Sequence, residues 1–236
     1  MRAGHSAVRA LNIQLTRGEI VRPFGSGWLI SSKGGFEPCP WSYDLAEFCP
    51  IDSTDSLLDL GCGAGPLLIA LNQAAVEFKR IIGVEIDQKR AFQAKRNMAL
   101  NGLHNGHIVR GDVRDICLNT RFDLIVANPP FYPVGWGRQS RNPGVAIATH
   151  ALKGGIAAFA HGAARLLSTH GTAVFIYDGS RMSDALLAIT AAGLTVERMR
   201  FLDDDRGRPA RVLLQASHMG PGLVVDRRRA KNVPEQ

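Results

Sequence analysis

Apolar and polar positions follow a repeating pattern along most of this chain. The run Ser56-Leu-Leu-Asp-Leu60 has the length and apolar content of a buried strand, and residues 66–76 continue it as an apolar helix. The same succession then recurs, with strands predicted over 80–85, 107–110, 122–127 and 172–177 and helices over 87–100, 150–167 and 181–191. This alternation implies a mostly parallel sheet with helices on both faces.

The last apolar runs do not follow the strand-to-helix alternation. Residues 195–201 and 208–217 flank a polar turn at 202–207, so they predict an antiparallel hairpin and not another crossover. They raise the number of predicted strands to seven. The sequence therefore predicts an α/β fold: a doubly wound, mostly parallel seven-stranded sheet of the Rossmann-like type that ends in a C-terminal antiparallel hairpin.

Composition divides the chain into three parts. Residues 1–50 are rich in glycine and proline and lack a clean period, which indicates an N-terminal extension or lid made of turns and short strands. Residues 51–220 carry the alternating elements and form the predicted catalytic domain, and residues 221–236 are expected to be a basic C-terminal tail. In the extension, Trp28, Trp41 and Tyr43 fit either a substrate entrance or packing onto the core.

Length and composition also limit the class of protein. A chain of 236 residues with 45% hydrophobic content suits one full core and is short for two. It has no apolar run of membrane-spanning length and no secretory leader, so we expect a cytoplasmic protein. Its four cysteines lack Cys-x-x-Cys pairs and histidine partners at metal spacing, which indicates reduced thiols and no metal site. They are Cys39, Cys49, Cys62 and Cys117.

The formal net charge is +7, because 28 basic residues stand against 21 acidic ones. Such an excess favours a polyanionic partner such as RNA, with a mildly basic surface and a solvated tail as the simpler alternative. The basic residues gather at Arg138 and Arg141, within 206–211 and within 227–231. Arg138 and Arg141 are the candidates for contact with RNA phosphates, and solvated loop arginines are the alternative.

A glycine-rich segment, Asp59-Leu-Gly-Cys-Gly-Ala-Gly65, lies where the first predicted core strand becomes a helix. Gly61, Gly63 and Gly65 let the backbone turn sharply and approach a ligand. Their G-x-G-x-G spacing differs from the G-x-G-x-x-G of dinucleotide sites. Asp59 would also repel a diphosphate, whereas it suits the cationic amino-acid end of S-adenosylmethionine. The sign of this charge favours S-adenosylmethionine over NAD as the cofactor.

Acidic residues also follow the next two predicted strands. Glu85 ends the second strand, a position from which a carboxylate can accept both ribose hydroxyl hydrogens of an adenosine ligand. Asp87 competes for this role but is better placed to cap the next helix. After the third strand, Asp112 is a candidate acceptor for the adenine amino group and the Val113 backbone for contact with the ring. An exposed loop aspartate is the alternative for Asp112.

The fourth predicted strand ends in Asn128-Pro-Pro-Phe131. Because the carboxyl ends of strands in an open α/β sheet face the ligand crevice, this motif lies where chemistry occurs, with a simple strand-ending turn as the alternative. The prolines hold the Asn128 amide in extended geometry, and Pro129 offers a carbonyl acceptor. On this rigid loop, completed by Pro130, two acceptors can bind both hydrogens of a planar amine. Phe131 offers a face for stacking.

Taken together, the segments around Gly61, Glu85 and Asp112 resemble the motifs of class I S-adenosylmethionine-dependent methyltransferases over residues 56–217. The Asn-Pro-Pro-aromatic loop resembles that of enzymes that methylate planar nitrogen, namely adenine N6, guanine N2 of ribosomal RNA, and glutamine of release factors. The resemblance implies S-adenosylmethionine as the cofactor and transfer of its methyl group to nitrogen. It also implies that Asn128 lies against both the cofactor and the acceptor.

The acceptor is suggested by a looser resemblance. Segments 142–150, 164–167, 198–201 and 211–216 are similar to those of bacterial tRNA(Val) adenine-N6 methyltransferases, which implies tRNA as partner. This chain departs from that family at Ala148-Thr-His-Ala151, where an Ala-Arg-His-Glu-like run is usual, and at Phe131, where tyrosine is frequent. Glutamine methylation of release factors, guanine-N2 methylation of ribosomal RNA, a silent S-adenosylmethionine- or RNA-binding module and an NAD-dependent oxidoreductase are the alternatives.

Overall fold

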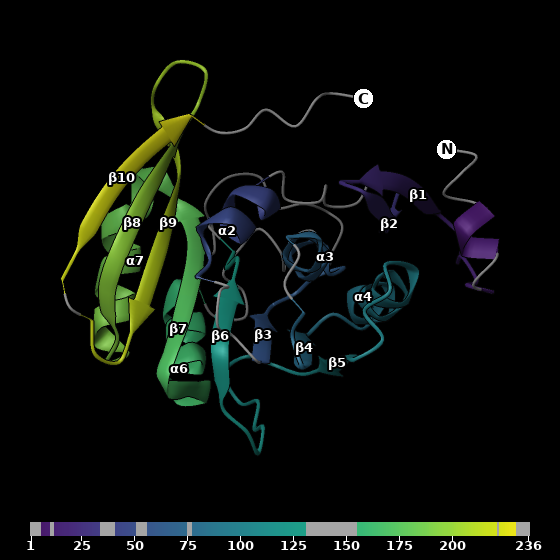
Figure 1. The fold of residues 1–236 in the computed structure, drawn as a ribbon, viewed down its shortest axis with the longest axis horizontal. Coiled ribbons are helices and arrows are strands. Elements are labelled where there is room, and N and C mark those ends of the chain that lie inside the picture. Colours follow the sequence, from purple (N-terminus) through teal and green to yellow (C-terminus); the bar gives the residue numbers. More distant parts are fainter. Residues whose placement is uncertain are drawn as a thin grey trace.

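The computed structural model describes residues 6–9, 12–33, 41–50, 56–74, 77–130, 155–220 and 222–229. In these ranges the main sheet has eight strands, and only β9 runs against the others (Figure 1). In spatial order they are β10 (Val224–Arg229), β8 (Thr195–Asp203), β9 (Pro209–Ser217), β7 (Leu167–Asp178), β6 (Phe122–Ala127), β3 (Ser56–Leu60), β4 (Arg80–Glu85) and β5 (Gly106–Arg110).

The predicted fold class is confirmed, and the main difference lies at one edge of the sheet. The bounds of β3, β4 and β6 agree with the prediction to the residue, and β8 and β9 form the expected antiparallel hairpin. The count of seven strands is wrong, because part of the expected tail forms β10, which pairs in parallel with β8. Ion pairs hold this strand: Asp226 binds Arg200 at 2.7 Å and Arg227 binds Asp203 at 2.5 Å.

Helices cover both faces of the sheet, and each face has its own apolar core. On one face lie α2 (Ser42–Phe48), α3 (Pro66–Gln73) and α4 (Gln88–Leu100), and on the other α6 (Ile156–Leu166) and α7 (Met182–Ala191), preceded by the 3₁₀ turn Gly179–Arg181. Fully buried side chains such as Leu68 and Phe175 fill the two cores. None of the helices in the described ranges has both the length and the apolarity needed to cross a membrane.

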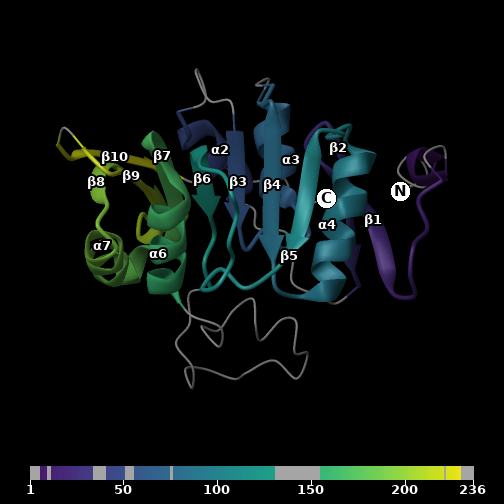
Figure 2. The ribbon, with the colours of Figure 1, turned by 90° about the horizontal axis from the view of Figure 1, so that it is seen from below.

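The N-terminal residues form a hairpin and a helix. Strands β1 (Glu19–Phe24) and β2 (Gly27–Ser32) make a separate two-stranded antiparallel sheet. This hairpin lies beside α4, at the end of the molecule opposite β8 and β10 (Figures 1 and 2). Helix α2 was not expected, because its seven residues are too few for a periodic signal. Trp28 and Trp41 are partly buried and pack against the apolar clusters, which favours packing over a substrate entrance for both.

Candidate functional site

The carboxyl ends of three adjacent strands bring the predicted site residues together. In the sheet, β3 lies between β4 and β6, and Leu60 at its end pairs with Val84 on one side and Ala127 on the other. Three predicted parts of the site therefore lie together at the edge formed by the carboxyl ends of the strands. They are the glycine turn after β3, Glu85 at the end of β4 and Asn128 just after β6. This is the edge at which doubly wound folds bind ligands.

The glycine turn is hydrogen-bonded to the neighbouring strand, and one of its glycines has open space where a side chain would be. The Gly61 and Cys62 N–H groups donate to the Val84 carbonyl at 2.8 and 2.9 Å. Gly61 has φ +75° and Gly63 φ +58°, in the left-handed region that favours glycine. A Cβ on Gly61 would come within 2.8 Å of the Phe159 ring, whereas one on Gly63 would meet nothing within 4 Å. Close packing against Phe159 explains why position 61 is a glycine, whereas Gly63 has open space beside it that a ligand can occupy.

Two buried carboxyl groups lie beside this turn. Glu85 accepts from the Gly63 N–H and from the Asp87 N–H, each at 2.8 Å. Burial raises the pKa of Glu85, and these two N–H groups and Arg90 oppose the shift. Asp59 is 2% exposed, and its Oδ2 has no hydrogen-bond partner among the described residues. Burial and the charge of Glu85 raise the pKa of Asp59 well above its ordinary value.

The other acidic candidates differ in their contacts. Asp87 is the N-cap of α4, as predicted, since its Oδ1 accepts from the Arg90 N–H at 2.9 Å. Both oxygens of Asp112 accept hydrogen bonds from Arg114, at 2.6 to 3.0 Å. Contact of Asp112 with an adenine amino group would therefore have to use its remaining lone pairs. Val113 is 7% exposed, and its side chain belongs to the core beneath α6.

Asn128 carries an unused acceptor at the end of β6. Its Oδ1 is buried, and no donor from the described part of the chain bonds to it. Leaving a buried carbonyl oxygen unpaired costs about 1–3 kcal/mol, so such an atom calls for an explanation in function or in a ligand. Pro129 is buried and Pro130 is half-buried. Phe131, Arg138 and Arg141 lie outside the described residues.

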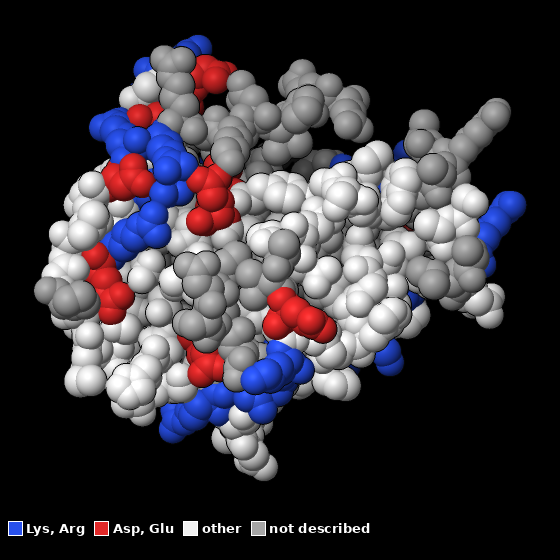
Figure 3. Space-filling model, in the orientation of Figure 1, with Lys and Arg blue, Asp and Glu red and all other residues white. Residues whose placement is uncertain are grey.

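The arginines that suggested a polyanionic partner largely have acidic neighbours. Arg228 binds Glu47 at 2.5 Å, and Arg211 lies 3.6 Å from Asp178. The pair Arg208 and Asp204 meets at 2.9 Å on the surface. Figure 3 shows acidic and basic side chains intermixed over β8 and β10. Intramolecular pairing thus weakens the positive field that the sequence predicts here.

The described ranges hold no group of three or more His, Cys, Asp or Glu side chains that could bind a metal ion. The cysteines in these ranges, Cys49, Cys62 and Cys117, are free thiols, and the first two are buried. Burial raises the pKa of both Cys49 and Cys62, which keeps them protonated and poorly nucleophilic.

Sequence reasoning missed a row of amide side chains on α4 that contacts both the hairpin and the glycine turn. Gln93, Asn97 and Asn101 recur every four residues and so share one face of the helix. Asn97 is fully buried and donates to the Ala64 carbonyl inside the glycine turn at 2.9 Å. The signal in the sequence was this i, i+4, i+8 spacing of amides on the face that an amphipathic helix buries.

Comparison with known proteins agrees with this geometry. The family model described as the methyltransferase small domain matches residues 44–176, more than half of the chain. The chain belongs to this family. Its match contains the glycine turn, Glu85 and the Asn-Pro-Pro motif, so the predicted methyltransferase resemblance is confirmed.

Several curated relatives carry one name. A tRNA1(Val) (adenine(37)-N6)-methyltransferase of Phocaeicola vulgatus is 30% identical over 186 residues, 77% of each chain. Proteins of the same name from Pasteurella multocida and Aeromonas hydrophila are 35% and 32% identical, over 39% and 62% of this chain. These two matches span 40% and 61% of the relatives, less than two thirds of their length.

Solved structures share the fold at low identity. Trm5b from Pyrococcus abyssi superposes with a TM-score of 0.61 at 15% identity, covering 87% of this chain and 57% of that one. A ribosomal protein L11 methylase from Lactobacillus delbrueckii superposes with a TM-score of 0.55 at 19% identity, covering 79% and 82%. At such identities the likeness establishes the fold alone.

Proposed function

We propose that this protein is an S-adenosylmethionine-dependent N-methyltransferase that methylates the exocyclic amine of adenine in a tRNA. The observation that carries the proposal is the buried Oδ1 of Asn128, which no described residue bonds, at the same sheet edge as the glycine turn and two buried carboxyl groups. Membership of the methyltransferase small domain family and the name shared by its relatives support it.

The residues of this edge fit S-adenosylmethionine. Asp59 Oδ2, to which no residue of the described ranges bonds, is a buried acidic acceptor suited to the cationic amino-acid end, and Gly63 leaves open space on the turn. Each oxygen of Glu85 accepts one backbone N–H and retains a lone pair for a ribose hydroxyl. In this proposal Asp112 and Val113 flank the adenine, and Gly61 and Gly65 hold the turn that approaches the ligand.

The chemistry at Asn128 needs no strong base. When bound, S-adenosylmethionine supplies an electrophilic methyl group on its sulfonium. Asn128 Oδ1 and the Pro129 carbonyl accept the two amine hydrogens, which turns the nitrogen lone pair toward that methyl group. Transfer would join the methyl group to this nitrogen and leave S-adenosylhomocysteine, and one of the two amine protons would pass to solvent. Pro130 stiffens the loop, and Phe131 stacks on the base.

The acceptor is tested by labelling. Purified protein is incubated with tritiated S-adenosylmethionine and, in parallel, total tRNA, ribosomal RNA or release factor, and the products are digested. We expect label in tRNA as N6-methyladenosine, with Arg138 and Arg141 contacting phosphate. Label found only as N2-methylguanosine in ribosomal RNA would show that guanine, not adenine, is the acceptor. Label found only in release-factor glutamine would show that glutamine is the acceptor. No label, together with no binding of the cofactor, would overturn the proposal.

Replacing Glu85 tests the cofactor site. We expect Glu85→Ala to raise the Kd for S-adenosylmethionine about tenfold or more, because two ribose hydroxyls lose their acceptor. Isothermal titration calorimetry measures the change. Asp184→Ala, which removes an exposed carboxyl group on α7, is the control and should bind as the wild type does. Equal affinities of the Glu85 variant and the wild type would contradict the ribose assignment.

A further inference from the structure

The amide side chains of α4 bind the outer edge of β2 as a neighbouring strand would. Asn97 accepts from the Ile30 N–H at 2.7 Å and donates to the Ile30 carbonyl at 2.9 Å. One helical turn later, Asn101 makes the same pair of bonds with Trp28, at 3.1 and 2.8 Å. One turn earlier, Gln93 donates to Ser32 Oγ at 3.0 Å. The hairpin is therefore docked through specific polar contacts along the whole of β2.

Two periodicities make this match possible. Four residues of an α-helix rise about 6 Å, and two residues of a strand rise about 6.7 Å. The three amides therefore lie opposite alternate residues of β2, which are Ser32, Ile30 and Trp28. The backbone N–H and C=O groups of Ile30 and Trp28 face α4 and point away from β1. Pro23, which is paired with Trp28 across the hairpin, has no N–H to donate, in agreement with this orientation.

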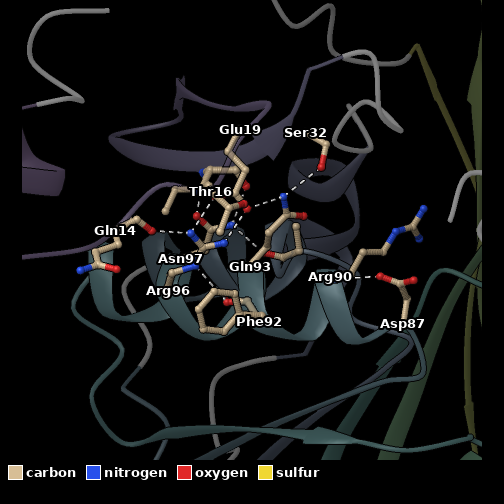
Figure 4. A network of polar contacts seen from close by, with 12 residues as sticks. Gln14, Thr16, Glu19, Ser32, Asp87, Arg90, Phe92, Gln93, Arg96 and Asn97 are labelled. Carbon is tan, nitrogen blue, oxygen red and sulfur yellow. Dashed lines mark hydrogen bonds and ion pairs between the residues drawn. The ribbon is translucent and has the colours of Figure 1, made fainter.

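A salt bridge adds to the docking on the same helix. Glu19 of β1 accepts from both terminal nitrogens of Arg96, at 2.5 and 2.7 Å, and from Gln93 at 3.0 Å (Figure 4). Its side chain is fully buried. The hairpin is thus fixed to α4 at both of its strands.

Asn97 differs from its two neighbours because it also reaches the glycine turn. Its Nδ2 has two hydrogens, and one goes to the Ile30 carbonyl and the other to the Ala64 carbonyl. The peptide group that holds this carbonyl continues to Gly65, and the preceding residue, Gly63, donates to Glu85. A single buried amide therefore joins the hairpin to the turn beside both carboxyl groups.

We propose that Asn97 is a positioning residue of the cofactor site, through which the N-terminal hairpin holds the glycine turn in the conformation that binds S-adenosylmethionine. This inference rests on the proposed function. It makes the hairpin a structural part of the cofactor site, although none of its residues has been assigned a contact with the cofactor.

The test compares Asn97→Asp with Asn101→Asp. Each change is nearly isosteric, keeps the acceptor for the β2 N–H and removes the donors, but only the first breaks a bond to the glycine turn. We expect both variants to lose thermal stability, Asn97→Asp more than Asn101→Asp because Asn97 is fully buried and Asn101 is partly exposed. Only Asn97→Asp should raise the Kd and the KM for S-adenosylmethionine about tenfold, with kcat at saturation nearly unchanged.

Calorimetry and steady-state kinetics on the full chain give the readouts. Equal Kd values for S-adenosylmethionine in the two variants would overturn the inference. A loss of affinity in both variants that is proportional to their loss of thermal stability would overturn it as well. If Asn97→Asp does not fold, Asn97→Ala takes its place with Asn101→Ala as its control, since each of these changes also removes the acceptor for a β2 N–H but adds no charge. The wild type is titrated first: absence of binding there would instead contradict the proposed function, and normal binding leaves the Asn97 comparison decisive.

Discussion

Asn128→Ala is expected to lower kcat by about 100-fold to 1000-fold while the Kd for S-adenosylmethionine stays within a few-fold of wild type. The size follows from the loss of one preorganised hydrogen-bonding group aimed at the reacting atom, which is worth about 3–4 kcal/mol in a buried site. The selectivity follows from the structure, because Asn128 Oδ1 bonds to no described residue, so its removal breaks no hydrogen bond of that atom within the described part of the chain. Single-turnover transfer and calorimetry measure the two quantities.

A second asparagine provides the control for Asn128→Ala. Asn105 precedes β5 and so lies at the amino ends of the strands, whereas Asn128 lies at their carboxyl ends. The Asn105 amide donates to the Phe78 carbonyl. Asn105→Ala should leave kcat unchanged even if it lowers stability. Undiminished transfer by Asn128→Ala would exclude the amide as an acceptor for the substrate amine. An equal loss of transfer and of cofactor binding would show that Asn128 serves the cofactor alone.

Glu19→Ala is expected to lower the free energy of unfolding by about 3–5 kcal/mol, because it leaves the Arg96 guanidinium buried without its charged partner. The Glu19 carboxylate accepts four hydrogen bonds, from Thr16, Gln93 and twice from Arg96, and is fully buried. Urea denaturation of both proteins at neutral pH measures the difference. The double variant Glu19→Ala/Arg96→Ala should lose less than the sum of its two single changes, since no unpaired charge is left.

The exposed pair Arg208 and Asp204 is the control for this prediction. Arg208 is 68% exposed, so Arg208→Ala should change the stability little even though its ion pair is almost as short. A loss from Glu19→Ala no larger than that from Arg208→Ala would show that the hairpin does not depend on its buried ion pair.

The contribution of Glu19 should also depend on pH. Burial alone would raise the pKa of Glu19, but hydrogen bonds from Arg96, Thr16 and Gln93 lower it from 4.5 to about 2. Because the folded protein holds the proton less tightly, the stability from this group is complete above pH 4.5 and is lost as the pH falls toward 2. The stability difference between the wild type and Glu19→Ala should therefore shrink below pH 4.5.

The sequence alone was sufficient for the parts of this protein that depend on local patterns. The strands β3, β4 and β6 were predicted to the residue, because a short apolar run bounded by turn residues has few other structures open to it. The placement of the glycine turn, Glu85 and Asn128 at the ligand-binding ends of the strands followed from the position of each at the carboxyl end of a predicted parallel strand. The N-cap role of Asp87 followed from its place at a helix start.

Only the tertiary structure decided the features that depend on partners distant in sequence. Val224–Arg229 became an edge strand because Arg200 and Asp203 on β8 supply the opposite charges, and no periodic signal in the tail could show this. Asn97 joins the hairpin to the glycine turn through partners that lie 67 and 33 residues away in the sequence. The physical reason is that the role of a buried polar side chain depends on the donor or acceptor to which it bonds. Only folding brings those partners within hydrogen-bond distance.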